Sequence, residues 1–187
     1  MKNFFKVFIV TAGLVLCFNV KSFAATDLAV WGGYAFAGNV KFYDLNEDFT
    51  ATQFGFKCHY YLDLFQSVRF GLGPFCQYAI MKSEETGGFN PLRNSIGLDA
   101  NFLFPRSSTP GFLPYVRITY SFYDKLKYDG ATKSVSGFGI GIGGGAEFAI
   151  TKTLRLFWEF MYDTPHCKKS ENVDVVNAAF NMGIKFL

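Results

Sequence analysis

The stretch GFGIGIGGGAEFAI, residues 137–150, holds the spacing of a phosphate-binding turn, because Gly139, Gly141 and Gly144 match the pattern G-x-G-x-x-G. Such a turn needs a strand that ends at the motif and a helix that begins there. Here the alternation of residue types continues through Ile150, which indicates one uninterrupted strand. The match therefore does not predict a nucleotide site. One face of this strand carries only glycine over five alternate positions: Gly137, Gly139, Gly141, Gly143 and Gly145.

His166 is the other residue with obvious chemical potential. Asp163, Cys167 and Ser170 lie near it in sequence, in what we expect to be the last loop, and this set suggests nucleophilic or acyl-transfer chemistry. His59 lies on the polar face of a predicted strand, where a buried, hydrogen-bonded histidine is the commoner case. The sequence shows no metal-ligand spacing, nucleophile elbow or Walker loop. We therefore expect neither an enzyme nor a cofactor.

The N-terminus has the layout of an export signal. Lys2 and Lys6 precede the apolar run VFIVTAGLVLCFNV, which is too short to span a bilayer as a helix. Small residues at Ser22 and Ala24 predict cleavage after Ala24, with Ala25 as the alternative. We therefore expect a signal peptide over residues 1–24 and one domain over residues 25–187.

Cleavage would also change the charge of the chain. The 18 Lys and Arg exceed the 15 Asp and Glu by three, and the three lysines Lys2, Lys6 and Lys21 leave with the signal. The mature chain is then formally neutral, so composition gives no reason to expect nucleic acid as a partner.

Period-2 alternation dominates the rest of the chain. In TQFGFKCHYYL, residues 52–62, alternate positions are apolar and the others are mostly polar or glycine, as in a strand with two unlike faces. The same pattern occurs in residues 68–73, 95–104, 116–122, 155–163 and 176–186, and less clearly in residues 27–37. Together with residues 137–150, these segments predict eight strands.

The predicted links alternate in length. The links after the first, third, fifth and seventh strands are long and polar: GNVKFYDLNEDFT, MKSEETGGFNPL, DKLKYDGATKSVS and PHCKKSENVD. DLFQS and TKT, after the second and sixth strands, are short, and PRSSTPGFL, after the fourth, is intermediate. An even strand number with long loops at one end is typical of an outer-membrane barrel of bacteria.

Two barrel types have this strand count, and they differ in which face points inward. A secreted lipocalin-like barrel encloses its apolar residues, whereas a membrane barrel turns them outward. The apolar face here carries too many Phe, Tyr, Trp, Leu and Ile to fit inside eight strands, while the polar face is rich in Gly, Ala, Ser and Asn. We therefore predict an all-β, eight-stranded antiparallel up-and-down transmembrane barrel and keep the lipocalin-like ligand-binding barrel as the alternative.

At this point the chain resembles the small OmpA/OmpX/Ail-like outer-membrane barrels of bacteria over its whole mature length. The resemblance rests on the export signal, the eight strands, the segment GGGAEFAITKTLRLFWEFMY and the final strand VNAAFNMGIKFL. It implies outer-membrane lipid and lipopolysaccharide as surroundings, and a C-terminal signal that the barrel-insertion machinery reads. Leu187 follows Phe186 and displaces that signal by one residue. The outward residues that form it are Phe180, Met182, Ile184 and Phe186.

Charged residues on the polar face should lie inside the barrel as a paired network, because unpaired enclosed charges cost several kcal/mol each. We expect Arg117 and Glu159 to reach toward each other across a trough over the glycine face. The expected role is structural or surface-interacting, with contacts to host or surface ligands through loops that hold Phe42, Tyr43, Phe49 and Phe89. A small pore and a lipid A-modifying enzyme are the further alternatives. The predicted interior charges are Lys57, Arg69, Asp99, Arg117, Glu147, Arg155, Glu159, Asp163 and Lys185.

Three cysteines would remain after signal cleavage. Strand geometry places Cys58 and Cys76 too far apart for a disulfide, so both are expected to be small residues of the apolar face. Cys167 is expected in a loop.

Overall fold

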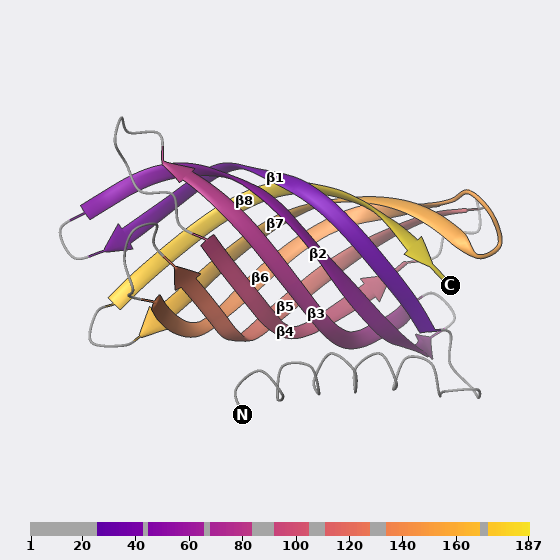
Figure 1. Ribbon diagram of the computed structural model, residues 1–187. Coiled ribbons are helices and arrows are strands. Elements are labelled where there is room, and N and C mark those ends of the chain that lie inside the picture. Colours follow the sequence, from indigo (N-terminus) through magenta and orange to yellow (C-terminus); the bar gives the residue numbers. More distant parts are fainter. Residues whose placement is uncertain are drawn as a thin grey trace, which may run out of the picture.

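Eight antiparallel strands close into one barrel, in which each strand pairs with its neighbours in the chain and β1 pairs with β8 (Figure 1). The computed structural model describes residues 26–42, 45–65, 68–83, 92–104, 111–127, 134–168 and 172–187, so the predicted signal peptide lies outside the described residues. The strands are β1 (Thr26–Phe42), β2 (Leu45–Phe65), β3 (Val68–Ser83), β4 (Leu92–Leu103), β5 (Phe112–Lys127), β6 (Ser134–Ala149), β7 (Leu154–Lys168) and β8 (Asn172–Phe186).

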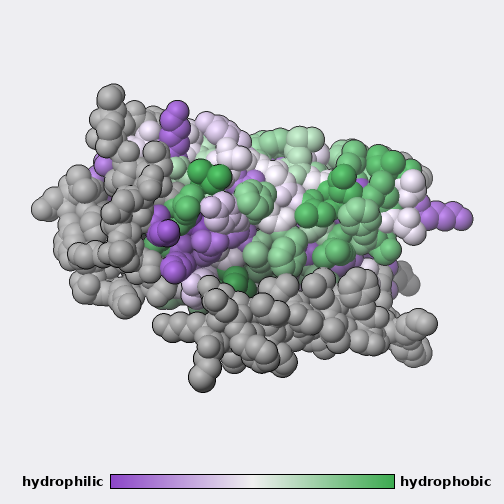
Figure 2. All heavy atoms as spheres, viewed as in Figure 1, coloured by the Kyte–Doolittle hydropathy of each residue, from purple (hydrophilic) through white to green (hydrophobic). Residues whose placement is uncertain are grey.

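The two faces of each strand meet opposite surroundings, because successive side chains of a strand point to opposite sides of the sheet. Phe54, Ile140 and Met182 are more than half exposed on the outside, whereas Lys57 and Asp99 are buried inside. The predicted eight-stranded barrel with its apolar face outward is therefore confirmed. Figure 2 shows hydrophobic side chains over much of the visible wall, with hydrophilic ones to the left of its middle and at its far right-hand end.

The two ends of the barrel differ. At one end, called here the turn end, β1 begins beside the end of β8, with Leu28 opposite Phe186. β2, β4 and β6 also end here, and β3, β5 and β7 begin here. The link 150–153 is a tight turn in which the Ile150 and Thr151 amides donate to the Leu154 carbonyl. At the opposite end, called the hairpin end, β1, β3, β5 and β7 end, and β2, β4, β6 and β8 begin.

At the hairpin end, two of the predicted long loops are wrong. The β1 and β2 strands stay paired to Phe42 opposite Leu45, and β7 and β8 stay paired to Lys168 opposite Asn172. Phe49, predicted in a polar loop, is buried inside the barrel. The reason is that both segments continue the strand ladder, which satisfies backbone groups that a loop would leave to water.

Several large side chains also point inward, which departs from the expectation of a uniformly small interior face. Trp31, Phe75 and Phe157 are buried inside. Each ring lies close to a glycine of a neighbouring strand: a Cβ at Gly55 would meet the Trp31 ring, one at Gly97 the Phe75 ring, and one at Gly183 the Phe157 ring. Interior glycines thus provide the space that the rings fill.

We predict that Gly183→Ala destabilises the barrel, whereas Gly32→Ala does not. A Cβ at Gly183 would lie 2.6 Å from the Phe157 ring and would also meet the Val30 carbonyl. Such overpacking typically costs about 1–3 kcal/mol. Gly32, on the neighbouring strand but facing outward, has only the Gln53 carbonyl within 4 Å, at 3.9 Å.

Urea unfolding in lipid vesicles, followed by tryptophan fluorescence, measures both variants. Equal midpoints for the two variants would show that the rings do not depend on the glycine spaces.

Candidate functional site

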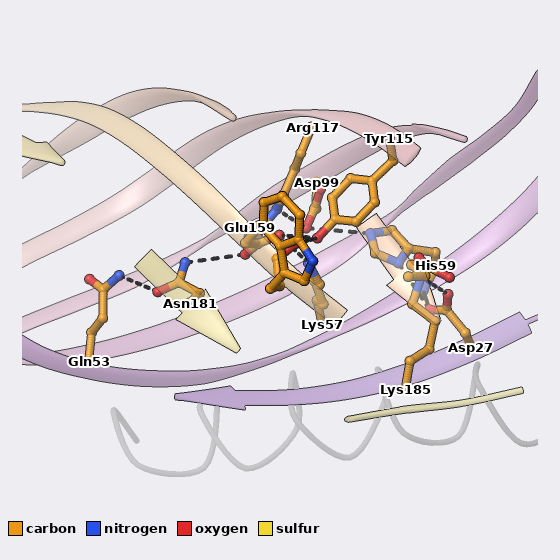
Figure 3. A network of polar contacts seen from close by, with 12 residues as sticks. Asp27, Gln53, Lys57, His59, Asp99, Tyr115, Arg117, Glu159, Asn181 and Lys185 are labelled. Carbon is orange, nitrogen blue, oxygen red and sulfur yellow. Dashed lines mark hydrogen bonds and ion pairs between the residues drawn. The ribbon is translucent and has the colours of Figure 1, made fainter. Parts of the chain in front are cut away.

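Glu159, on β7, is the centre of a polar network inside the barrel (Figure 3). Its carboxylate accepts from Lys57 Nζ at 3.0 Å, from the Tyr115 hydroxyl at 2.8 Å and from Asn181 Nδ2 at 3.2 Å. It also pairs with Arg117 Nη1. These donors come from β2, β5 and β8, so one buried carboxylate ties β7 to strands on other sides of the barrel.

Asp99 and Asp27 extend the network through a histidine. Arg117 Nε donates to Asp99 Oδ2 at 2.8 Å. His59 lies between the two carboxylates, with Nδ1 3.0 Å from Asp27 Oδ1 and Nε2 3.4 Å from Asp99 Oδ2. His59 is therefore the buried, hydrogen-bonded histidine that its strand position predicted.

Lys185 anchors the turn end of the network. Its Nζ lies 2.9 Å from Asp27 Oδ2, donates to the Tyr61 hydroxyl at 2.9 Å and pairs with Glu147. Arg155 Nη1 lies 3.5 Å from the second oxygen of Glu147 and is 19% exposed, so it closes the network at the edge of the interior.

A second ionic cluster lies nearer the hairpin end. Arg93 donates to Asp124 at 2.7 Å and to Asp163 at 2.9 Å. The Ser95 hydroxyl donates to Asp124 at 2.7 Å, and Ser121 bonds the same carboxylate. This cluster joins strands β4, β5 and β7.

Amide side chains connect the two parts. Gln53 donates to Asn181 Oδ1 at 2.8 Å, and Asn181 bonds Glu159. Asn177 donates at 3.4 Å both to Gln53 and to Asp163, while Gln77 donates to Gln53 at 2.9 Å. The result is one continuous network to which every strand contributes, for example Asp27, Lys57, Gln77, Asp99, Arg117, Glu147, Glu159 and Lys185 in chain order of the strands.

The charges of this network nearly cancel. Its cations are Lys57, Arg93, Arg117, Arg155 and Lys185, and its carboxylates are Asp27, Asp99, Asp124, Glu147, Glu159 and Asp163. His59 lies against two of those carboxylates. Removing either partner of a buried ion pair leaves an uncompensated charge inside the barrel. Each charged residue of the network is therefore needed to balance its partner.

The structure places eight of the nine predicted interior charges in this network, with Arg155 at its edge. Arg69 is the exception and corrects the prediction. It has the inward parity but lies at the turn-end rim, where its side chain is 40% exposed and bonds Asp63, itself 74% exposed, at 2.8 Å. Alternation gives the face of a residue but not its depth along the barrel.

Sequence reasoning missed Asp27, Arg93 and Asp124. Arg93 lies between the predicted loop 81–92 and the predicted strand 95–104, and Asp124 begins a segment predicted as a polar loop. Asp124 also follows a register shift between Ser121 and Asp124 that changes the parity of β5. Asp27 stands at the start of the least regular predicted strand. A bulge has no signature in simple alternation, although an isolated charge at the edge of an apolar pattern is a usable signal.

The glycine face lies inside the barrel on β6, which runs unbroken from Ser134 to Ala149. A strand at this place excludes the turn and helix that a phosphate cradle needs. The register pairs Arg117 with Gly143 and Glu159 with Gly145, as the sequence predicted. Met161, not foreseen, lies over Gly143, so the trough holds a thioether as well as the ion pair.

The cluster around His166 is divided by the wall, and the loop placement is wrong. His166 lies on β7 and bonds Asp174 of β8. Asp163, on the same strand, belongs to the interior cluster of Arg93. Residue 170 lies outside the described residues. His166 and Asp163 therefore do not form one catalytic site.

The remaining predicted residues concern the outer face. Met182, Ile184 and Phe186 are exposed on the outside of β8, in line with Phe180. Their recognition by the barrel-insertion machinery stays a prediction. Cys76 is a free thiol, so it makes no bridge with Cys58. Within the described residues, no group of three His, Cys, Asp or Glu is arranged to hold a metal ion, and no helix is long and apolar enough to cross a membrane.

We predict that Glu159→Gln lowers the free energy of unfolding by about 3–5 kcal/mol, the usual cost of breaking a buried ion pair from one side. The amide would leave Lys57 and Arg117 without their shared carboxylate. Asp63→Asn is the matched control, because its pair with Arg69 is exposed and worth about 0–1 kcal/mol.

Urea unfolding in lipid vesicles measures both. Adding Arg117→Met to Glu159→Gln should cost less than the sum of the two single changes. Equal losses for Glu159→Gln and Asp63→Asn would contradict the central place of Glu159.

Known proteins share this architecture. The family model described as "Outer membrane protein beta-barrel domain" matches residues 10–186. Neisserial surface protein A is 15% identical, with a TM-score of 0.61 over 88% of this chain and 99% of that one. OprG from Pseudomonas aeruginosa is 13% identical, with a TM-score of 0.48 over 90% and 98%.

Ail, the attachment invasion locus protein of Yersinia pestis, is 16% identical, with a TM-score of 0.45 over 86% and 98% of the two chains. No curated protein matches the sequence. The likeness to Neisserial surface protein A shows a shared fold; the identities are too low to transfer a function.

Proposed function

The chain belongs to the outer membrane protein beta-barrel domain family, and from this we propose that it is an integral, non-enzymatic barrel of the bacterial outer membrane with a closed interior. Its role in this proposal is structural and surface-interacting. The hairpin end faces outward from the cell and the turn end faces the periplasm, following the general layout of such barrels. Its surroundings are then outer-membrane lipid and lipopolysaccharide.

The main support for a closed interior is the continuous polar network, to which all eight strands contribute. Beside it, toward the hairpin end, lies an apolar cluster of the interior. Nine buried residues form this hairpin-end cluster: Ala35, Val40, Phe49, Ala51, Ala79, Met81, Leu126, Val175 and Ala179. An eight-stranded barrel has an interior that side chains just fill, so these residues and the ionic network leave no continuous path for hydrated solutes in this proposal.

We predict that the purified protein shows no stable conductance steps in planar bilayers. The ion pairs of the interior would have to separate before ions pass, at a cost of several kcal/mol for each unpaired charge. Single-channel recording at fixed voltage makes the measurement, with a general porin in the same bilayers as positive control. Discrete, long-lived steps from the protein alone would overturn the closed interior and favour a small pore.

The shape of the β1–β2 hairpin supports a surface-interaction role. Pairing of β2 with β3 ends at Phe49 opposite Ser83, whereas β1 and β2 stay paired as far as Phe42 and Leu45. The hairpin therefore extends past the end of β3, and three of its described side chains in this part are both exposed and polar: Lys41, Asn46 and Asp48.

We predict that shortening this hairpin weakens attachment to host cells while the barrel still folds. Val40 and Glu47 are register partners, so replacing residues 41–46 with Asn-Gly closes the hairpin by a two-residue turn of favoured type. Flow cytometry of bacteria that display either form measures attachment, and heat-modifiable migration on gels monitors folding. Equal attachment by both forms would remove the adhesion role and leave the structural one.

A further inference from the structure

The outer face of three neighbouring strands changes from apolar to polar at one level near the hairpin end. On β1, the exposed Phe36 gives way to Asn39 and Lys41. On β7, Tyr162 is followed on the same face by Thr164 and His166. Such a change marks the boundary between hydrocarbon and headgroups on a membrane barrel. The boundary at the hairpin end is that of the outer leaflet in the proposed function.

A pocket of about 370 Å³ lies on the outer wall at this level, across β1, β8 and β7. Its walls are of two kinds. Its apolar lining consists of Val176, which is exposed, and of the buried Pro165 and Val175, and the polar part is formed by Asn39, Lys41, Thr164, His166 and Asp174. A pocket with both kinds of wall suits a molecule that is itself amphipathic.

Register places the charged side chains of the pocket in one row. Asp174 of β8 lies opposite Lys41 of β1 on one side and opposite His166 of β7 on the other. His166 Nδ1 bonds Asp174 Oδ1, and the His166 ring is also 5.8 Å from the Phe138 ring. The carboxylate and the Phe138 ring orient the imidazole, and Nε2 is the ring nitrogen that does not bond Asp174.

More lysines stand on the outer wall near the hairpin end. Lys82 of β3 is opposite Thr50, and Lys125 and Lys127 of β5 are on the outward side of their strand, flanking the buried Leu126. With Lys41, these make four lysines, against the outward carboxylates Asp48 and Asp174. Asp48 accepts from Asn39 at 2.8 Å, and Asp174 is engaged by His166, so among the described residues the lysines outnumber the carboxylates at this boundary.

We propose that the pocket binds the phosphorylated headgroup of a lipid in the outer leaflet. Lys41 and His166 hold the phosphate, and an acyl chain follows Val176 onto the apolar wall below. Lysine binds phosphate well as a point charge, and basic residues at a membrane surface attract anionic headgroups. The inference rests on the membrane placement of the proposed function, but not on whether the interior is closed.

Native mass spectrometry of the detergent-solubilised protein tests the site. Phosphatidic acid is the probe, and phosphatidylcholine with the same acyl chains is the comparison lipid. We expect phosphatidic acid to bind more tightly than phosphatidylcholine. Lys41→Gln should lower the affinity for phosphatidic acid by about fivefold, the usual contribution of one lysine near a membrane surface. His166→Gln should reduce binding in the same direction.

Lys152→Gln is the matched control, because Lys152 is an exposed lysine in the turn at the opposite end. The proposal fails if Lys41→Gln and Lys152→Gln bind phosphatidic acid equally, or if phosphatidylcholine binds as well as phosphatidic acid. Displacement by an equal concentration of inorganic phosphate would show a free-anion site instead of a lipid site. Conductance recordings are separate from this assay, so a failure here is distinguishable from a failure of the closed interior.

Discussion

The interior of this barrel is governed by the need to pair every charge that closure encloses. Glu159 shows this most directly, since it accepts from Lys57, Tyr115, Arg117 and Asn181 within one narrow space. No two neighbouring strands could supply these partners alone, because the donors lie on β2, β5 and β8. Ion pairs across the lumen thus connect the strands in addition to the backbone hydrogen bonds of the sheet. These ion pairs can form only once the barrel has closed.

The ionic network and the apolar outer face are complementary consequences of one alternation. In the proposed membrane placement, lipid accepts Phe54, Ile140 and Met182 on the outside without the clustering that water would impose. The opposite parity then holds the polar side chains, which have only one another as partners. This is the reverse of a soluble barrel, where the packed interior is apolar and the charges meet water.

The sequence was sufficient to predict strand number, faces and much of the register, because a period of two depends only on residue type. Arg117 opposite Gly143 and Glu159 opposite Gly145 follow from counting outward from the adjoining links. The depth of a residue along the barrel and the length of each strand are harder to predict from the sequence. Arg69 has the right parity but lies at the rim, and Phe49 was assigned to a loop because strands with polar outer faces read as loops. Asp124 was hidden by a register shift that alternation does not record.

The glycines beneath the aromatic rings limit which substitutions the interior can accept during evolution. Trp31 occupies the space that a side chain at Gly55 would need, and Phe157 does the same at Gly183. A smaller ring would free only part of that space, because a side chain at Gly55 would also meet the Cys76 carbonyl and one at Gly183 the Val30 carbonyl. Glycine should therefore persist at both positions among homologues, even where the ring above it is replaced.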